Sequence, residues 1–445
     1  MTSTSLSGSV EALMRPLLGR GAQAALRLRL ALLAGALVML VTTLTRLPPG
    51  FYDLVSRPGR RGAHDLAARV REVHAWFAGQ PVYGTIGTAD YPPASYALLW
   101  PFLGWLDVPT ARVLWALSTL AMLVWFSWLL VRESGARGLA EQGFVALLPW
   151  AGYAGAATIR LGQVGHHLLP LTLASLLLLL RGRAGWRRDA AGAALFTLTL
   201  VKPHLSAPFF WLVTWLPRRW RPAALIVALY AALTALAVAF QGGNLFGVAR
   251  DLGDEAGTVG VFAGHGNVSL LLWALGLESW ILPAALVMLA GYGVWVYRWR
   301  EADLWLLLAV TALFTRLWIS HRHYDDVLVV FAMLALFRVA KFGAGPERYP
   351  AGLLLALNWA LWLSPGPWYS SDPNSTLDYI FRGVIAVVWL LSFGFLIWCV
   401  QRGVTLGPAA ATAGADDAPR PRGRRAPDAG RYSAPTSARA SRRRK

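Results

Sequence analysis

Long apolar segments recur along most of the chain, from residue 25 to residue 400. A helix needs ~20 mostly apolar residues to cross the hydrocarbon core of a bilayer, and several of the segments reach that length. The apolar runs lie at about 25–45, 92–106, 110–131, 143–158, 164–180, 190–216, 222–240, 281–299, 303–320, 326–340, 350–365 and 379–400. The pattern predicts an all-α polytopic membrane protein with about 10–12 transmembrane helices, in which the run at 190–216 can form two short pieces.

The composition agrees with a membrane protein. Of the 445 residues, 56% are hydrophobic and 15% are charged, whereas soluble domains carry roughly 25% charged residues. These values exclude a soluble enzyme and a DNA-binding factor. Cys399 is the only cysteine, so no disulfide can form within the chain, which excludes a secreted disulfide scaffold. The net charge of +19 fits a membrane protein because cytoplasmic loops collect Lys and Arg beside anionic lipids.

Arginine-rich connectors indicate which loops face the cytoplasm. They lie at 181–188, 218–221, 298–300 and 338–341. If all four are cytoplasmic, the apolar segments between residues 91 and 217 cannot simply alternate, and some of them are expected to be short, re-entrant or broken. The parity of the spans stays open at this point.

The same pattern divides the chain into three parts. Residues 1–24 are expected to form a cytoplasmic N-terminus, because no small-residue cleavage site follows the first apolar run and that helix is therefore retained. Residues 25–400 are predicted to form the transmembrane domain. Residues 401–445 are basic, are rich in Ala and Pro, and are predicted to be a disordered cytoplasmic tail against the anionic leaflet, without a nucleic-acid partner.

A long first external loop, at 46–90, is predicted to carry an amphipathic helix on the outer membrane surface. Its apolar residues recur at the spacing of one helical face, and Gly79 suits the end of the helix; these residues are Leu66, Val70, Val73 and Phe77. Two further connectors, at 241–268 and 366–378, are also expected outside.

Charged and imidazole side chains near membrane depth are candidate functional residues because they are costly there. Asp65, near the start of the amphipathic helix, can be an N-cap carboxylate or a general base at the membrane surface. Lys202 lies between two apolar runs and can be a snorkelling lysine or a cation for a lipid phosphate.

The segment Arg316–Asp326 holds two histidines, two arginines and two aspartates within eleven residues. His321, His323 and Asp325 could bind a metal by their spacing. Without a further ligand motif, hydrogen bonding and phosphate pairing are preferred. The plainer alternative is a salt-bridged loop.

Several short motifs follow one another in an order that resembles glycosyltransferase family 87, the polytopic GT-C enzymes that include polyprenyl-phosphomannose-dependent mannosyltransferases. The motifs are residues 79–83, Tyr91-Pro92-Pro93, Pro101, Gly162-Gln163, Lys202-Pro203 and His323-Tyr324. The resemblance covers roughly residues 25–400. It implies a GT-C architecture in a bacterial plasma membrane, a polyprenyl-phosphate sugar donor with mannose as the expected sugar, a lipid or glycan acceptor on the external face, and Asp65 as the catalytic base.

Transfer from a lipid phosphate needs a base for the acceptor hydroxyl and cations for the departing phosphate. We assign the phosphate side to Lys202, His321, His323 and Arg160, and substrate binding to Tyr91, Gln163, His166 and Tyr324. No DxD motif is present, so inverting transfer without a metal or another cofactor is expected. The alternative class is a transporter or lipid flippase for an anionic substrate, although no internal repeat is visible in the sequence.

Overall fold

The computed structural model describes residues 20–57, 62–86, 89–181, 184–242, 244–259, 266–363 and 376–406. All of these belong to one compact unit, Met1–Gly407. Three predictions lie wholly or largely outside the described residues: those for the N-terminus before residue 20, for the connector at 366–378, and for the tail after residue 406.

The described residues form helices and no strands, which confirms the predicted all-α polytopic class. The helices are α2 (Arg20–Ser56), α3 (His64–Phe77), α4 (Pro93–Leu103), α5 (Val108–Ser134), α6 (Gly138–Ala151), α7 (Tyr153–Leu161), α8 (Gly165–Leu180), α9 (Trp186–Thr199), α10 (Pro203–Trp215), α11 (Arg221–Phe240), α12 (Leu245–Val259), α13 (Val268–Ala274), η1 (Glu278–Trp280), α14 (Ile281–Arg298), α15 (Leu304–Trp318), η2 (His323–Leu328), α16 (Val329–Phe342), α17 (Arg348–Leu363) and α19 (Thr376–Gln401).

Five helical segments within the described ranges are long and apolar enough to cross a bilayer, and the bent pair α6–α7 makes up to six. The five are Leu26–Ser56, Val108–Ser134, Arg221–Phe240, Glu278–Arg298 and Ile380–Gln401. Each of them exposes large apolar side chains, as helices that face lipid do. Shorter apolar helices, among them α8 and α15, pack between them. The larger number of about 10–12 spans stays a prediction.

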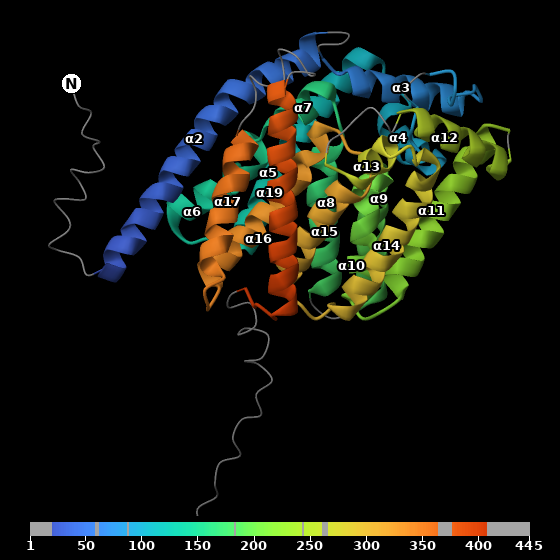
Figure 1. The fold of residues 1–445 in the computed structure, drawn as a ribbon. Coiled ribbons are helices and arrows are strands. Elements are labelled where there is room, and N and C mark those ends of the chain that lie inside the picture. Colours follow the sequence, from blue (N-terminus) through green and yellow to red (C-terminus); the bar gives the residue numbers. More distant parts are fainter. Residues whose placement is uncertain are drawn as a thin grey trace, which may run out of the picture. The chain divides into compact units, whose positions relative to one another are not determined.

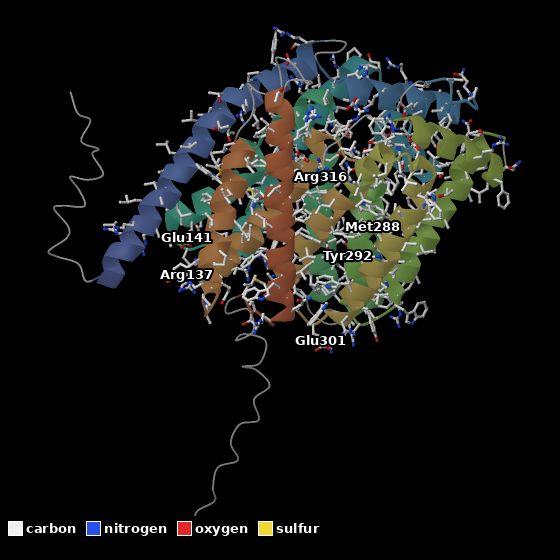
Figure 2. All side chains as sticks on the ribbon, in the orientation of Figure 1. Arg137, Glu141, Met288, Tyr292, Glu301 and Arg316 are labelled. Carbon is white, nitrogen blue, oxygen red and sulfur yellow. The ribbon has the colours of Figure 1, made fainter. Side chains whose placement is uncertain are left out.

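Ion pairs and hydrogen bonds gather the basic connectors at one end of the helices, here called the basic end. Arg338 donates to the backbone of Glu133 at 2.7 Å and also to the backbone of Leu406. Arg219 pairs with Asp189 at 2.7 Å, and Arg181 pairs with Glu133. Figure 2 shows Arg137 and Glu301 below Arg316, toward this end. The arginine-rich connectors therefore share one side, as the positive-inside rule requires.

The alternation that the sequence left open is resolved by two features. Helix α4 has 11 residues and is only ~16 Å long, so it cannot cross the ~30 Å hydrocarbon core. The run at 190–216 forms two helices, α9 and α10, with a break at residues 200–202. Because α4 stays at one end and α9–α10 turns back, every arginine-rich connector reaches the basic end.

The opposite end, here called the α3 end, is covered by α3 and α4 (Figure 1, top). The indole N–H of Trp76 on α3 donates to the carbonyl of Ala237 at the end of α11 at 2.9 Å, and its ring stacks on Tyr96 of α4 at 4.6 Å. These contacts confirm a helix in the first loop and join it to the bundle. Tyr91 and Tyr96 are both buried at this end.

Two helix boundaries lie near the first loop, and the end of α2 differs from the prediction. Helix α2 continues through Pro48 and Pro49 to Ser56, about ten residues past the predicted end of the first apolar run. Pro93 occupies the first turn of α4, where a missing backbone N–H costs nothing.

Candidate functional site

The break between α9 and α10 places Lys202 at the α3 end. Pro203 opens α10, and its ring restricts Lys202 to a non-helical conformation at the N-cap position. The Lys202 side chain turns inward, and only 4% of the residue is exposed. Lys202 is therefore buried at the α3 end of the bundle and does not snorkel to water.

The connector between α7 and α8 lies directly against α3. Gly162 has φ +70°, and a Cβ at this position would come within 2.6 Å of the Leu66 Cβ. The backbone N–H of Ala63 donates to the carbonyl of Arg160 at 2.8 Å. This close approach, which only glycine permits, brings Gln163 under the first turn of α3.

Four side chains form a continuous series of contacts, here called the polar chain: Asp65, Gln163, Lys202 and Asp325. The Nε2 of Gln163 donates to Oδ2 of Asp65. The Nζ of Lys202 donates to Oε1 of Gln163 at 3.3 Å and to Oδ1 of Asp325 at 2.6 Å. The polar chain therefore connects the first loop with three other segments of the α3 end.

The first turn of α3 does not use Asp65 as a cap. The N-cap residue is Ala63, which has φ 52° and makes no side-chain capping bond. The Asp65 carboxylate instead accepts from Gln163 and is half-buried. Of the two readings of Asp65, the capping one has no support in the structure, and the general-base role stays a prediction.

Asp325 is the most heavily bonded carboxylate of the polar chain. Its Oδ2 accepts from the backbone N–H of Arg322 at 3.2 Å and lies 3.6 Å from Nδ1 of His321. Burial favours the neutral carboxyl, but Lys202 and His321 outweigh burial and hold the pKa of Asp325 well below its usual range. Asp325 is therefore ionised and already neutralises Lys202, so Lys202 is not a free cation.

A second ion pair fixes the segment that carries Asp325. Asp326 accepts from Nε of Arg316 and from the hydroxyl of Tyr153. Both members of the Arg316–Asp326 pair are fully buried. Thr158 donates to the carbonyl of Tyr324 at 3.0 Å. These bonds tie η2 to α7 and α15. In its structure this segment is therefore a salt-bridged loop, the plainer of the alternatives considered from the sequence.

The remaining predicted residues lie at different distances from the polar chain. Tyr324 places its ring 4.7 Å from the Lys202 Nζ, and Tyr91 lies close enough to Asp65 and Asp325 to interact with their charge. Arg160 is exposed, and it interacts electrostatically with the half-buried His323. His166 is buried and turns away to the carbonyl of Gly155, 3.2 Å from its Nε2.

A charged network on α3 was not found from the sequence. Arg69 lies 2.8 Å from Glu72 and 3.4 Å from Asp90, and its guanidinium covers the ring of Tyr91 at 4.1 Å. Burial raises the pKa of Glu72 to about 8, although Arg69 opposes the shift. The signal was available, because Asp65, Arg69 and Glu72 follow at i, i+4 and i+7 and form a stripe beside the apolar face.

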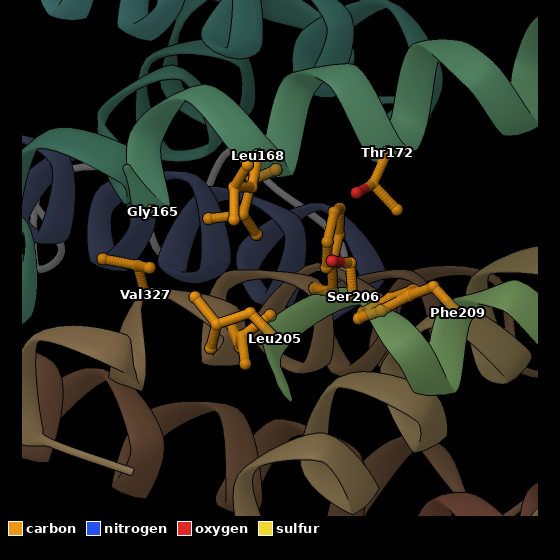
Figure 3. A pocket seen from close by; sticks show the side chains of 10 residues that line it. Gly165, Leu168, Thr172, Leu205, Ser206, Phe209 and Val327 are labelled. Carbon is orange, nitrogen blue, oxygen red and sulfur yellow. The ribbon is translucent and has the colours of Figure 1, made fainter. Parts of the chain in front are cut away.

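A small cavity lies among helices α8, α10 and η2, which also adjoin residues of the polar chain in sequence (Figure 3). It has a volume of about 10 Å³ and is enclosed mainly by apolar side chains of α8, α10 and η2, including Leu168, Leu205, Phe209 and Val327. This volume suits about one water molecule. The cavity therefore has no room for a sugar.

Comparison with known proteins gives one match. A family model described as Glycosyltransferase family 87 matches residues 88–320, which is more than half of the chain. The matched region contains Gln163 and Lys202, begins after Asp65 and ends before His321. Neither the curated proteins nor the solved structures contain a match to this chain.

Proposed function

Because the chain belongs to glycosyltransferase family 87, we propose that it transfers a sugar from a polyprenyl-phosphate donor to a lipid or glycan acceptor on the external face of a bacterial plasma membrane. The family makes it a glycosyltransferase, and its apolar helices make it a multi-pass membrane protein. Mannose is the expected sugar.

The polar chain is the observation that supports this reaction best. In it a single side chain, that of Gln163, connects a half-buried carboxylate, Asp65, to a buried ammonium, Lys202. Transfer from a lipid phosphate needs one group of each kind, a base for the acceptor hydroxyl and a cation for the departing phosphate.

In the proposed step the acceptor oxygen attacks the anomeric carbon of the donor from the side opposite the phosphate. Asp65 takes the proton of the acceptor hydroxyl as the new C–O bond forms. The bond between the anomeric carbon and the phosphate oxygen breaks, and its electron pair leaves with the lipid phosphate. The sugar is transferred with inversion, in a single displacement.

Gln163 has two tasks in this scheme. Its amide donates to Asp65 and accepts from Lys202, so one side chain sets both the orientation of the base and the position of the cation. Orientation of this kind keeps reacting groups in a productive geometry before the reaction begins.

The phosphate side needs more positive charge than Lys202 supplies, because Asp325 already neutralises it. Arg160 is exposed on α7 and interacts electrostatically with the half-buried His323 of η2. We propose that the Arg160 guanidinium, together with N–H groups of His323 and His321, stabilises the negative charge that grows on the bridging oxygen as the sugar departs. Stabilising this charge more in the transition state than in the ground state raises kcat.

The test is an assay of purified protein in detergent with polyprenyl-phosphomannose and a membrane lipid extract, followed by detection of transferred mannose. The Asp65→Asn variant should lose transfer, whereas Asp251→Asn, a matched change of an exposed carboxylate on α12, should keep it. Activity should survive EDTA. Transfer from a nucleotide sugar but not from the lipid phosphate would refute the proposed donor, and loss in EDTA with recovery in Mg²⁺ or Mn²⁺ would refute metal-independent transfer.

A further inference from the structure

Three side chains next to the polar chain have the arrangement of a metal site. The ligand atoms of His204, His321 and Asp325 all lie within 4.8 Å of one another. His204 comes from the first turn of α10, His321 lies two residues before η2, and Asp325 lies within η2. We propose that these three side chains bind a transition-metal ion of the Zn²⁺ class, a property that goes beyond the proposed function and shares His321 with its phosphate side.

The spacing of the ligand atoms is close to that of a bound zinc. Two ligands at 2.0–2.1 Å from a tetrahedral Zn²⁺ are about 3.4 Å apart. Nδ1 of His321 lies 3.6 Å from Oδ2 of Asp325. The rings of His204 and His321 are 5.2 Å apart between centroids, so small side-chain rotations bring the third ligand into place.

In the part of the chain that the structure describes, the unpartnered ring nitrogens of His321 are independent support for a metal ligand role of this side chain. Only 1% of the residue is exposed, and within the described residues neither ring nitrogen has a hydrogen-bond partner. Buried polar atoms nearly always have a partner, and an exception calls for an ion, a water or a functional role. A metal held between His321 and Asp325 gives the imidazole lone pair a partner.

The donor set selects the kind of metal. Two imidazole nitrogens and one carboxylate oxygen suit Zn²⁺ and its first-row neighbours, whereas Mg²⁺ and Ca²⁺ prefer oxygen ligands. Three protein ligands also leave a fourth position open on a tetrahedral zinc. A group that is not a metal ligand also orients the Asp325 carboxylate, because the backbone N–H of Arg322 donates to its Oδ2 at 3.2 Å.

Lys202 offers a further test of the proposal, because its ammonium competes with the metal ion for the Asp325 carboxylate. Its Nζ contacts Oδ1 of Asp325 at 2.6 Å, so the ammonium and the metal would lie on opposite oxygens of one carboxylate. Their mutual repulsion weakens metal binding. Removal of the ammonium should therefore tighten the metal, although the same change removes a residue of the proposed phosphate side.

The experiment measures binding directly and does not depend on transfer activity. Tag-free protein in detergent is stripped with EDTA and dialysed, and is then titrated with Zn²⁺ by calorimetry and with Co²⁺ by its visible absorption. We expect one site per chain and a preference for Zn²⁺ over Mg²⁺. The double variant His204→Gln/His321→Gln should bind Zn²⁺ at least ~100-fold more weakly.

The matched control is His64→Gln/His74→Gln, which removes two exposed histidines of α3 and should leave Zn²⁺ affinity unchanged. Lys202→Met should tighten Zn²⁺ binding by roughly tenfold. Equal Zn²⁺ affinity in native protein and in the His204/His321 double variant would overturn the site. Unchanged affinity in Lys202→Met would overturn the placement of the ion on Asp325.

Discussion

The pair formed by Lys202 and Asp325 allows a structural role to be separated from a catalytic one. Both side chains are 5% exposed or less, and the contact between them is 2.6 Å. Lys202→Met keeps the length of the side chain but leaves the ionised carboxylate buried without its cation. Breaking a buried pair by removing one partner costs about 3–5 kcal/mol, and we expect a loss of stability of that size.

The double variant Lys202→Met/Asp325→Asn removes both charges and should recover most of this stability, because no uncompensated charge remains. Transfer activity should stay low in the double variant, since the cation near the proposed phosphate position is still absent. Stability recovered without activity is the result that identifies Lys202 as more than a structural partner.

The assay is reversible unfolding in mixed micelles, read by tryptophan fluorescence, with sugar transfer measured on the same preparations. Glu301→Gln is the control, because the Arg218–Glu301 pair is about two-thirds exposed and such pairs contribute at most about 1 kcal/mol. Native stability in Lys202→Met would refute the reasoning, because Asp325 would then have found another partner or a proton. Full activity in the double variant would refute the role of Lys202 in transfer.

Four further predictions follow from the site and the fold. Asp65→Asn should fold normally and lower kcat by roughly 10²-fold, the usual scale for a lost general base, and steady-state kinetics on folded protein that show near-native kcat would contradict it. His323→Ala should lower kcat more than it raises KM for the lipid donor; equal kinetics to the native enzyme would make this side chain structural. The pKa of Glu72 rises from 4.5 to about 8 on folding, so the folded state holds more protons and loses stability as the pH rises through this window; Glu72→Gln should flatten that decline in a series of melting temperatures between pH 5 and pH 9, and an unchanged slope would contradict it. Labelling of single cysteines in a Cys399→Ser background should place the loop at 62–86 outside and the tail after residue 406 inside, and labelling of both from one side would overturn the topology.

The amino-acid sequence by itself determined the class of the protein and much of its local structure. The repeated apolar runs predicted an all-α membrane protein, and the spacing from Leu66 to Phe77 predicted α3. These features depend on periodicity and on backbone restrictions within a few residues, which a sequence displays directly. The order of short motifs predicted the family that the family model confirms.

The sequence did not determine the partners of the charged residues. Lys202 has no acidic neighbour in sequence, yet Asp325 pairs with it across 123 positions, and Gln163 reaches Asp65 across 98. Burial of the Arg69–Glu72 pair was missed for the same reason, because an exposed helix and one covered by α4 and α11 have the same local pattern.

Only the tertiary structure decided the parity of the helices. The sequence allowed several segments between residues 91 and 217 to be short or broken, and their hydropathy did not distinguish among them. Packing selected α4 as the helix that stays at the α3 end and residues 200–202 as the break. The physical reason is that apolar periodicity is a local property, which reports how much of a helix is buried. The direction of a helix and the neighbours of its polar side chains depend instead on contacts between segments far apart in the chain.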